Sequence, residues 1–406
     1  MNYTFPEILH LDDALRAING SDEFIVAERE WGYVVNYVVS TESTFPEVKN
    51  EEHTSAAMKV SALHSAIRRE CRGLLFDKQG KIMSRRLHKF FNVNERYETL
   101  FYRIDFNLPH VILEKLDGSM ITPIKMPDGI IRWGTKMGLT DVAMGAEEFV
   151  ANHVQYDTFA EQCMDVGMTP IFEWCSRKQR IVVDYPVDRL ILTAMRHNVT
   201  GKYISYHDLK WYGDINNIEV VKSYPGTPES MTHLVNETRD AEGIEGWIIR
   251  FDDGHMLKVK GEWYVRIHKT KDALTQEKNI VNLIVNEKID DTKAFMLDDD
   301  RARVEKFEHV FWEGVQESIE RYERYYQLVL SSGLDRVEYA KKWMPTIKPQ
   351  DSFAPTYVFA RFDNKDSREL ILNQIKRNIG TSTKLETVRH LWGDHQWNYA
   401  NIEQDA

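Results

Sequence analysis

The sequence has 406 residues, of which 42% are hydrophobic and 28% are charged, and its formal net charge is −11. This length accommodates two domains with substantial cores, and the composition is typical of a soluble globular protein. No apolar run approaches the length of a bilayer span, and residues 1–11 lack the basic start and apolar core of a signal peptide. We therefore expect no membrane partner.

The three cysteines, Cys71, Cys163 and Cys175, form no Cys-x-x-Cys pair, so neither a zinc site nor a disulfide framework is expected. A reducing, cytoplasmic setting is favoured. The negative net charge by itself argues against a nucleic-acid partner, yet such binding requires only a local basic face. Basic side chains gather in three stretches, each close to a motif described below: Arg85, Arg86, His88 and Lys89; Arg177, Lys178 and Arg180; Lys258, Lys260, Arg266, Lys269 and Lys271.

Up to about residue 272, short β-rich segments alternate with turn signals. Hairpins are predicted where Asp77-Lys78-Gln79-Gly80 separates residues 73–76 from 81–87 and where Asp252-Asp253-Gly254 separates residues 244–251 from 255–260. Further strands are expected at residues 111–114, 130–135, 170–174 and 190–196, and the clearest helix at 143–153.

After residue 275 the pattern becomes helical. Apolar residues recur at helical spacing within residues 300–331, although Gly314 interrupts them, and Gly333 supplies a stop signal. Residues 367–378, ending at Gly380, and residues 384–392 predict two more helices. We therefore expect an α/β domain at residues 1–272 and a helical domain at residues 273–406.

The central motif is Glu114-Lys115-Leu116-Asp117-Gly118-Ser119, at the end of a predicted strand. A lysine amine is protonated at neutral pH because its ordinary pKa is about 10.4, so a lysine nucleophile requires nearby cations or burial. The glycine permits a backbone conformation or a close ligand approach that a side chain would block. Taken alone, Lys-x-Asp-Gly is more often an ordinary surface turn.

Lys-x-Asp-Gly is also the signature of covalent nucleotidyltransferases, namely DNA ligases, RNA ligases and mRNA capping enzymes. Over about residues 30–295 the chain resembles the phage-type ATP-dependent RNA ligase 1 family in particular. The further motifs that carry the resemblance occur in the family's order, which is more specific than any one motif: Glu70-Cys71-Arg72-Gly73; Lys89-Phe90-Phe91-Asn92; Phe172-Glu173-Trp174 with Arg180-Ile181-Val182; Glu245-Gly246-Trp247; and Lys258-Val259-Lys260 with Trp263-Tyr264-Val265 and His268.

The resemblance implies an α+β fold: a nucleotidyltransferase (ATP-grasp-like ligase) domain of antiparallel sheets with flanking helices, followed by an all-helical C-terminal domain. It implies a monomer in the cytoplasm, or in the host cytoplasm if a phage encodes it. It also implies three nucleotidyl transfers. Lys115 takes AMP from ATP as a covalent adduct, the AMP passes to an RNA 5′-phosphate, and a 3′-hydroxyl then seals the bond and releases AMP.

The resemblance also implies roles for individual residues. Lys258 and Lys260, two apart on a predicted strand, share a face and would neutralise the triphosphate. Glu173 is expected to contact the ribose hydroxyls and Glu245 the Mg²⁺ ion, although both are candidate metal ligands and Mn²⁺ is an alternative metal. Residues that would contact the nucleotide complete the set: Tyr37, Arg72, Lys89, Phe91, Asp117, Gly118 and Lys136.

Three of these assignments have alternatives. Phe91 would stack on the adenine or belong to the core. Asp290, in Asp290-Asp291, would bind a metal or be an acid at a helix N-terminus. Arg72 could also grip the RNA 5′-phosphate.

Two positions depart from the family pattern. Leu116 occupies a position where relatives often carry a polar residue, and we expect little effect from it. Ser176-Arg177-Lys178-Gln179 is more basic than the resemblance implies, which predicts an altered RNA contact.

The expected partner is single-stranded or nicked-loop RNA. By resemblance, the helical domain would select a structured RNA such as a cleaved tRNA anticodon loop, in tRNA repair. Its aromatic residues could stack on bases or form a core: Trp312, Tyr322, Tyr325, Tyr326 and Trp343. A DNA ligase, a GTP-dependent capping guanylyltransferase and a non-catalytic RNA-end binder remain alternatives. The first two usually add an OB-fold where this chain is helical.

Overall fold

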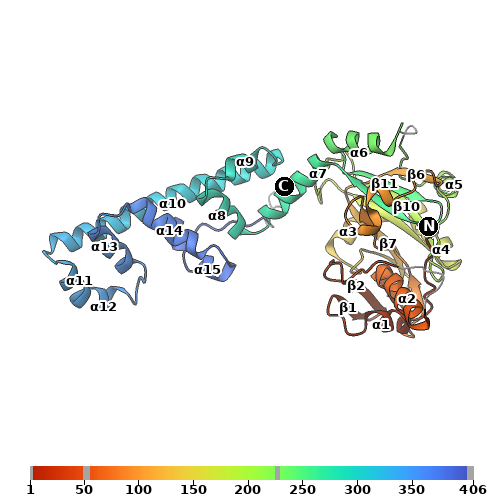
Figure 1. Cartoon of the computed structure of the whole chain (residues 1–406), viewed down its shortest axis with the longest axis horizontal. Coiled ribbons are helices and arrows are strands. Elements are labelled where there is room, and N and C mark those ends of the chain that lie inside the picture. The colour runs from red at the N-terminus through yellow and green to blue at the C-terminus, as the bar shows by residue number, and fades with distance from the viewer. Residues whose placement is uncertain (1–2, 49–54, 225–228, 400–406) are drawn as a thin grey trace. The chain divides into compact units, whose positions relative to one another are not determined.

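A computed structural model describes residues 3–48, 55–224 and 229–399 (Figure 1). The chain divides into two compact units, Met1–Val265 and Arg266–Ala406. The division falls inside helix α7 (Glu262–Leu274), whereas the sequence placed the boundary after residue 272. Each unit is described by itself below.

In the residues that the structure describes, the first unit contains three four-stranded sheets. All strand pairs within them are antiparallel except β5 and β12, which are parallel and pair Phe91 with Leu257 and Asn92 with Lys258. In spatial order the first sheet is β1 (Phe24–Arg29), β2 (Gly32–Tyr37), β3 (Arg72–Phe76) and β4 (Ile82–Ser84); the second is β10 (Arg189–His197), β9 (Met168–Cys175), β7 (Ser119–Lys125) and β8 (Ile131–Gly134); the third is β5 (Phe91–Asn92), β12 (Met256–Lys260), β11 (Gly246–Phe251) and β6 (His110–Glu114).

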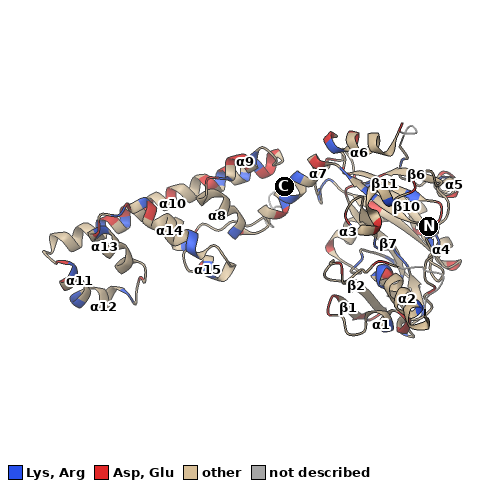
Figure 2. Ribbon diagram, viewed as in Figure 1, with Lys and Arg blue, Asp and Glu red and all other residues tan. Residues whose placement is uncertain are grey.

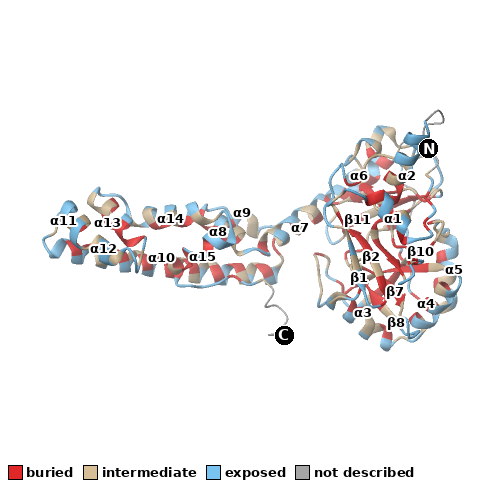
Figure 3. Cartoon of the chain, turned by 90° about the horizontal axis from the view of Figure 1, so that it is seen from below, coloured by how far each residue is buried: buried red, intermediate tan, exposed pale blue. Residues whose placement is uncertain are grey.

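Helices flank these sheets, and buried residues concentrate between the two kinds of element (Figure 3). The serines that precede α2, α5 and α6 each accept a hydrogen bond from the first helical turn, as N-caps do. The helices are α1 (Leu11–Ile18), α2 (Ala56–Glu70), α3 (Asp141–Ala151), α4 (Gln155–Asp165), α5 (Tyr206–Asn216) and α6 (Met231–Asp240), with the 3₁₀ turns η1 (Tyr97–Thr99) and η2 (Phe101–Arg103).

The described part of the second unit consists of helices: α8 (Glu277–Val285), α9 (Ile289–Lys293), α10 (Asp298–Ser331), α11 (Arg336–Lys342), α12 (Met344–Ile347), α13 (Ala354–Phe362), α14 (Ser367–Asn378), α15 (Ser382–Glu386) and the 3₁₀ turn η3 (Arg389–Trp392). The helix predicted at residues 384–392 is instead two elements, α15 and η3. Acidic and basic residues are interspersed along α10 (Figure 2). Tyr322 and Tyr326 are buried in this unit's core, where Trp312, Tyr325 and Trp343 also pack.

Gly314, which interrupts the apolar pattern of α10, is required by packing. A Cβ atom at this position would overlap the backbone carbonyl of Trp392 in η3. The glycine therefore lets η3 lie directly against the long helix.

The predicted fold class is confirmed: an α+β unit built mainly of antiparallel sheets precedes a helical unit. Within residues 3–48, 55–224 and 229–399, the structure has no helix long and apolar enough to span a membrane.

Candidate active site

Lys115 lies at the end of β6, where its backbone N–H donates to the Gly246 carbonyl over 2.9 Å. Its ammonium is 2.5 Å from one carboxylate oxygen of Glu245, whose other oxygen is 2.9 Å from the Lys260 ammonium. Glu245 is only 4% exposed. The pairing of β6, β11 and β12 therefore brings three predicted site residues into one ion-paired group.

Two glycines allow this close assembly. Gly246 has a φ of +140°, and a Cβ there would overlap the Val259 carbonyl on the neighbouring strand. A Cβ on Gly118 would overlap the Trp174 carbonyl at the end of β9. Side chains at either position would push apart the strands that carry Lys115, Glu173 and Lys260.

The Asp117 carboxylate accepts hydrogen bonds from other parts of the protein. It accepts hydrogen bonds from the backbone N–H groups of Val182 and Val183, each at 2.7 Å, and from the Tyr264 hydroxyl at 2.6 Å. Its own N–H donates to the Tyr185 hydroxyl at 2.9 Å. Asp117 is 3% exposed, so its observed contacts position the loop that carries Lys115.

A second group of predicted residues surrounds Tyr37 at the end of β2. Asn36 lies opposite Arg72 in the β2–β3 pairing, and the ammonium groups of Lys89 and Lys136 lie 5.1 and 4.7 Å from the Tyr37 ring centroid. Burial raises the pKa of the Tyr37 phenol, but Arg72, Lys89 and Lys136 together outweigh burial and lower it. The phenol is therefore in a positive field.

Lys258 connects the two groups electrostatically. Burial lowers the pKa of its ammonium well below the ordinary value, and Arg72, Lys115, Lys89 and Lys260 lower it further. Because neighbouring cations disfavour one another's charged forms, this cluster is suited to a polyanion such as a triphosphate.

Glu173, on β9, is the second carboxylate close to Lys115. Burial raises its pKa to about 7; Lys115 acts in the opposite direction, while Glu245 adds to the rise. Two carboxylates beside this cationic cluster match the donor set that Mg²⁺ takes from proteins, in which phosphate oxygens and waters complete the shell. Within the described ranges, no cluster of three or more acidic, histidine or cysteine side chains forms a self-sufficient metal site.

Phe91 and Asp290 lie where the alternative interpretations placed them. Phe91 is 2% exposed and packs in the core cluster that also contains Phe45. Asp290 is in the first turn of α9 in the second unit, exposed and 3.0 Å from Lys293.

One predicted basic stretch is not a surface. Arg85, Arg86 and His88 are at most 2% exposed. Arg85 lies inside because the Glu70 carboxylate pairs with it, and the ring of His88 packs against Phe90 and hydrogen-bonds Tyr203. Arg177 and Lys178, by contrast, are exposed.

Two tyrosines in this region were not among the predicted site residues. Tyr264 bonds Asp117 and lies 5.2 Å from the Lys260 ammonium, and Tyr185 accepts from the Asp117 backbone. Their positions in the sequence could have identified them, because Tyr264 lies within the fifth motif and Tyr185 closely follows Arg180-Ile181-Val182.

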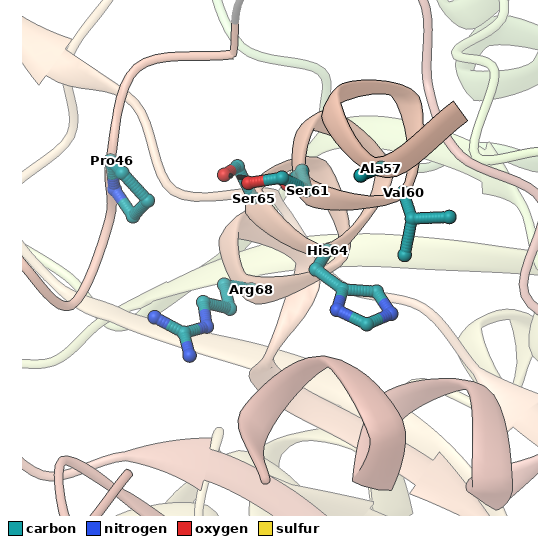
Figure 4. Close-up of a pocket in the computed structure, with 7 residues that line it drawn as sticks. All are labelled: Pro46, Ala57, Val60, Ser61, His64, Ser65 and Arg68. Atoms are coloured by element: carbon teal, nitrogen blue, oxygen red, sulfur yellow. Dashed lines mark hydrogen bonds between the residues drawn. The ribbon is translucent and has the colours of Figure 1, made fainter. Parts of the chain in front are cut away.

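A pocket of about 320 Å³ lies elsewhere in the first unit. Pro46 faces one side of α2 across it (Figure 4), and none of its lining residues belongs to the predicted site: Pro46, Ala57, Val60, Ser61, His64, Ser65 and Arg68. It is therefore distinct from the cluster around Lys115.

Comparison with known proteins gives matches to both units. One family model, described as RNA ligase, matches residues 70–264, and another, described as T4 RNA ligase 1, C-terminal domain, matches residues 271–385. A protein of Thermovibrio ammonificans named "Putative RNA ligase" is 29% identical over 296 residues, which cover 70% of this chain and 71% of that protein. RNA ligase 1 of bacteriophage TS2126 is 24% identical over 270 residues, which cover 63% of this chain and 62% of that protein.

Among solved structures, an archaeal ATP-dependent RNA ligase is 12% identical with a TM-score of 0.41, and the match covers 69% of each chain. The two family models match most of both units of this chain. Residues 70–264 therefore match the RNA ligase family, and residues 271–385 match the C-terminal domain of T4 RNA ligase 1.

Proposed function

We propose that this protein is an ATP-dependent RNA ligase that joins 5′-phosphate and 3′-hydroxyl ends through a Lys115–AMP intermediate. The observation that carries the proposal is the convergence of Lys115, Glu245 and Lys260 beside the cations around Tyr37. This arrangement supports a role for Lys115 as a nucleophile beside a surface that would bind a polyphosphate.

In the first step, the Lys115 ammonium gives a proton to solvent, its amine nitrogen forms a bond to the α-phosphorus of ATP, and pyrophosphate leaves with the electrons of the broken P–O bond. Lys258 and Lys260 stabilise the charge that develops on the phosphate oxygens. The Asp117 contacts with Val182, Val183 and Tyr264 keep the Lys115 loop in place.

In the second step, an RNA 5′-phosphate oxygen takes the AMP and the Lys115 nitrogen leaves. In the third, a 3′-hydroxyl oxygen attacks the adenylylated 5′-phosphate, and AMP leaves as the phosphodiester forms. Positioning and electrostatics account for most of such catalysis. Glu173 and Glu245 would hold a divalent cation, Mg²⁺ or Mn²⁺, which would neutralise charge on the phosphates.

The test is incubation with α-labelled ATP or GTP followed by denaturation, and ligation of matched RNA and DNA strands. We expect acid-labile label from ATP alone and joining of RNA. Labelling by GTP instead would indicate a capping enzyme, preferential joining of DNA a DNA ligase, and no labelling a non-catalytic RNA-end binder. Over residues 262–399 the described chain contains helices and no strand, which favours the RNA ligase over the two alternatives that usually carry an OB-fold.

The basic residues after β9 support an RNA contact near the site. The loop is anchored where Trp174 donates to Gln179 and where the Arg177 backbone donates to Asp188. The side chains of Arg177 and Lys178 are exposed, and among the described residues neither has an ion-pair partner. The loop, held by these two hydrogen bonds, thus presents two exposed cations that could contact RNA phosphates.

For the double substitution Arg177→Ala/Lys178→Ala, we expect weaker RNA binding and unchanged labelling by ATP. For a single strand, each phosphate contact contributes about 0.7 to the slope of log affinity against log salt concentration. The magnitude of this slope should therefore fall by about 1.4. The measurement is RNA affinity from 50 to 200 mM salt. Lys202→Ala/Lys210→Ala, which removes two exposed lysines of the same unit, is the control, and an equal effect there would remove the case for a specific contact.

We also propose that the physiological substrate is a broken structured RNA such as a cleaved tRNA. The match of residues 271–385 to the C-terminal domain of T4 RNA ligase 1 supports a dedicated role for the helical unit. Ligation of a cleaved tRNA and of an unstructured strand, compared at equal concentrations, tests this. Equal efficiency would argue against it.

A further inference from the structure

Arg86 is a buried arginine with no acidic partner among the described residues. It is 2% exposed; its Nε donates to the Thr122 hydroxyl at 2.9 Å and its Nη1 to the Gly73 carbonyl. Its Nη2 is buried and has no hydrogen-bond partner in the described structure.

The neighbouring buried arginines are different. Arg85 and Arg196 share the buried carboxylate of Glu70, at 3.0 and 2.6 Å. Burying a cation without a countercharge is costly, because water no longer solvates it and no partner replaces the water. The fold supplies that countercharge to two arginines and leaves the third without one.

Arg86 lies in the interior next to Gly73 and close to the backbone of Lys136, beneath the residues around Tyr37. Gly73 has a φ of +82°, and a Cβ there would come within 2.8 Å of Arg86 Nη1 and within 2.7 Å of the Lys136 carbonyl oxygen. The guanidinium thus supports the corner where Arg72-Gly73 meets the backbone of Lys136. Burial and, to a lesser extent, the charge of Arg72 together lower the pKa of Arg86 to about 9, so the two cations lie in one another's field.

We propose that Arg86 is a positioning residue of the phosphate subsite. It holds Arg72-Gly73 against Lys136 and adds its charge to the field that binds the polyphosphate of ATP, which supplies the missing countercharge. The inference rests on the proposed function, because it takes the anion to be ATP or the pyrophosphate released from it.

The test compares Arg86→Met, which removes the charge, with Arg86→Lys, which keeps it. We expect Arg86→Met to raise the KM for ATP in Lys115 labelling about tenfold, because the phosphate subsite loses one cation of its field and the support of Arg72-Gly73, with kcat within about threefold. Arg86→Lys should recover most of this loss. Tripolyphosphate should raise the unfolding temperature of the wild type and have a smaller effect on Arg86→Met.

Arg250→Met is the matched control. Arg250 is also buried, at 4% exposure, and its Nη1 has no described partner, but the groups acting on it are Tyr203, Tyr206 and Asp252 rather than the phosphate-site cations. Its substitution should leave the KM for ATP unchanged. Removing an uncompensated charge should also leave the ligand-free unfolding temperature of Arg86→Met equal to or above that of the wild type.

An unchanged KM and an unchanged tripolyphosphate response in Arg86→Met would overturn the inference. So would equal losses in Arg86→Lys and Arg86→Met with a lowered unfolding temperature, since Arg86 would then be a packing residue. If wild-type protein is labelled by ATP while these expectations fail, the proposed function stands without this role for Arg86. If the wild type is not labelled, the proposed function itself fails.

Discussion

Replacing Lys115 with alanine or methionine should abolish covalent labelling by ATP and reduce ligation of 5′-phosphate RNA by on the order of 10⁴-fold or more, because no other group would supply the nucleophile. The fold should survive, since Glu245 keeps its ion pair with Lys260 at 2.9 Å. Denaturing gels after incubation with α-labelled ATP measure the first effect, and thermal unfolding checks the second.

The same variants separate a nucleophile from a cation that only stabilises charge. RNA that is already adenylylated bypasses the first two steps, so the variants should still seal it at a rate much closer to that of the wild type. Lys125→Met is the control, because Lys125 is an exposed β7 lysine paired with Asp165. Label retained by Lys115→Ala would show that another residue carries the AMP.

The elements that local pattern determines were predictable from the sequence. The helix predicted at residues 367–378 is α14 with the same bounds, and α10 begins two residues before the predicted residue 300. The hairpins at residues 72–84 and 246–260 also formed around the turns that Asp and Gly predicted. Helices α2, α5 and α6 were not identified, although Ser55, Ser205 and Ser230 were available as N-cap signals.

The site was predictable as a set of residues but not as an arrangement. Motif order indicated Lys115, Glu245 and Lys260, yet the carboxylate that bridges the two lysines depends on the pairing of β6 with β11 and of β11 with β12. Likewise, the charge of Arg85 and Arg86 suggested a surface, because nothing local reveals that Glu70 and Thr122 meet them in the interior. Such pairings are set by tertiary packing.

The buried ion-pair network around Glu70 should produce the largest stability effect. Glu70→Gln would leave Arg85 and Arg196 buried without a countercharge, and breaking a buried pair in this way costs about 3–5 kcal/mol. For a domain of this size, the unfolding temperature should fall by on the order of 10 °C. Glu28→Gln, which removes an exposed partner of Lys78, should cost no more than about 1 kcal/mol.

Low pH should weaken the stabilisation that the same ion-pair network around Glu70 provides. Arg196 and Arg85 outweigh burial and hold the pKa of Glu70 at about 2, below its ordinary value of 4.5. Between these values the unfolded chain binds a proton that the folded protein does not, so stability falls as pH drops from 4.5 towards 2, by about 3 kcal/mol in total. The buried His255 also destabilises the fold in acid, because burial lowers its pKa from 6.5 to about 4. The contribution of His255 is the same in the wild type and in Glu70→Gln, so the difference in unfolding free energy between these two proteins reports on Glu70. This difference should be constant above about pH 5 and shrink below pH 4.5. A difference that stayed constant through this range would mean that Glu70 stabilises the fold by packing rather than by its charge.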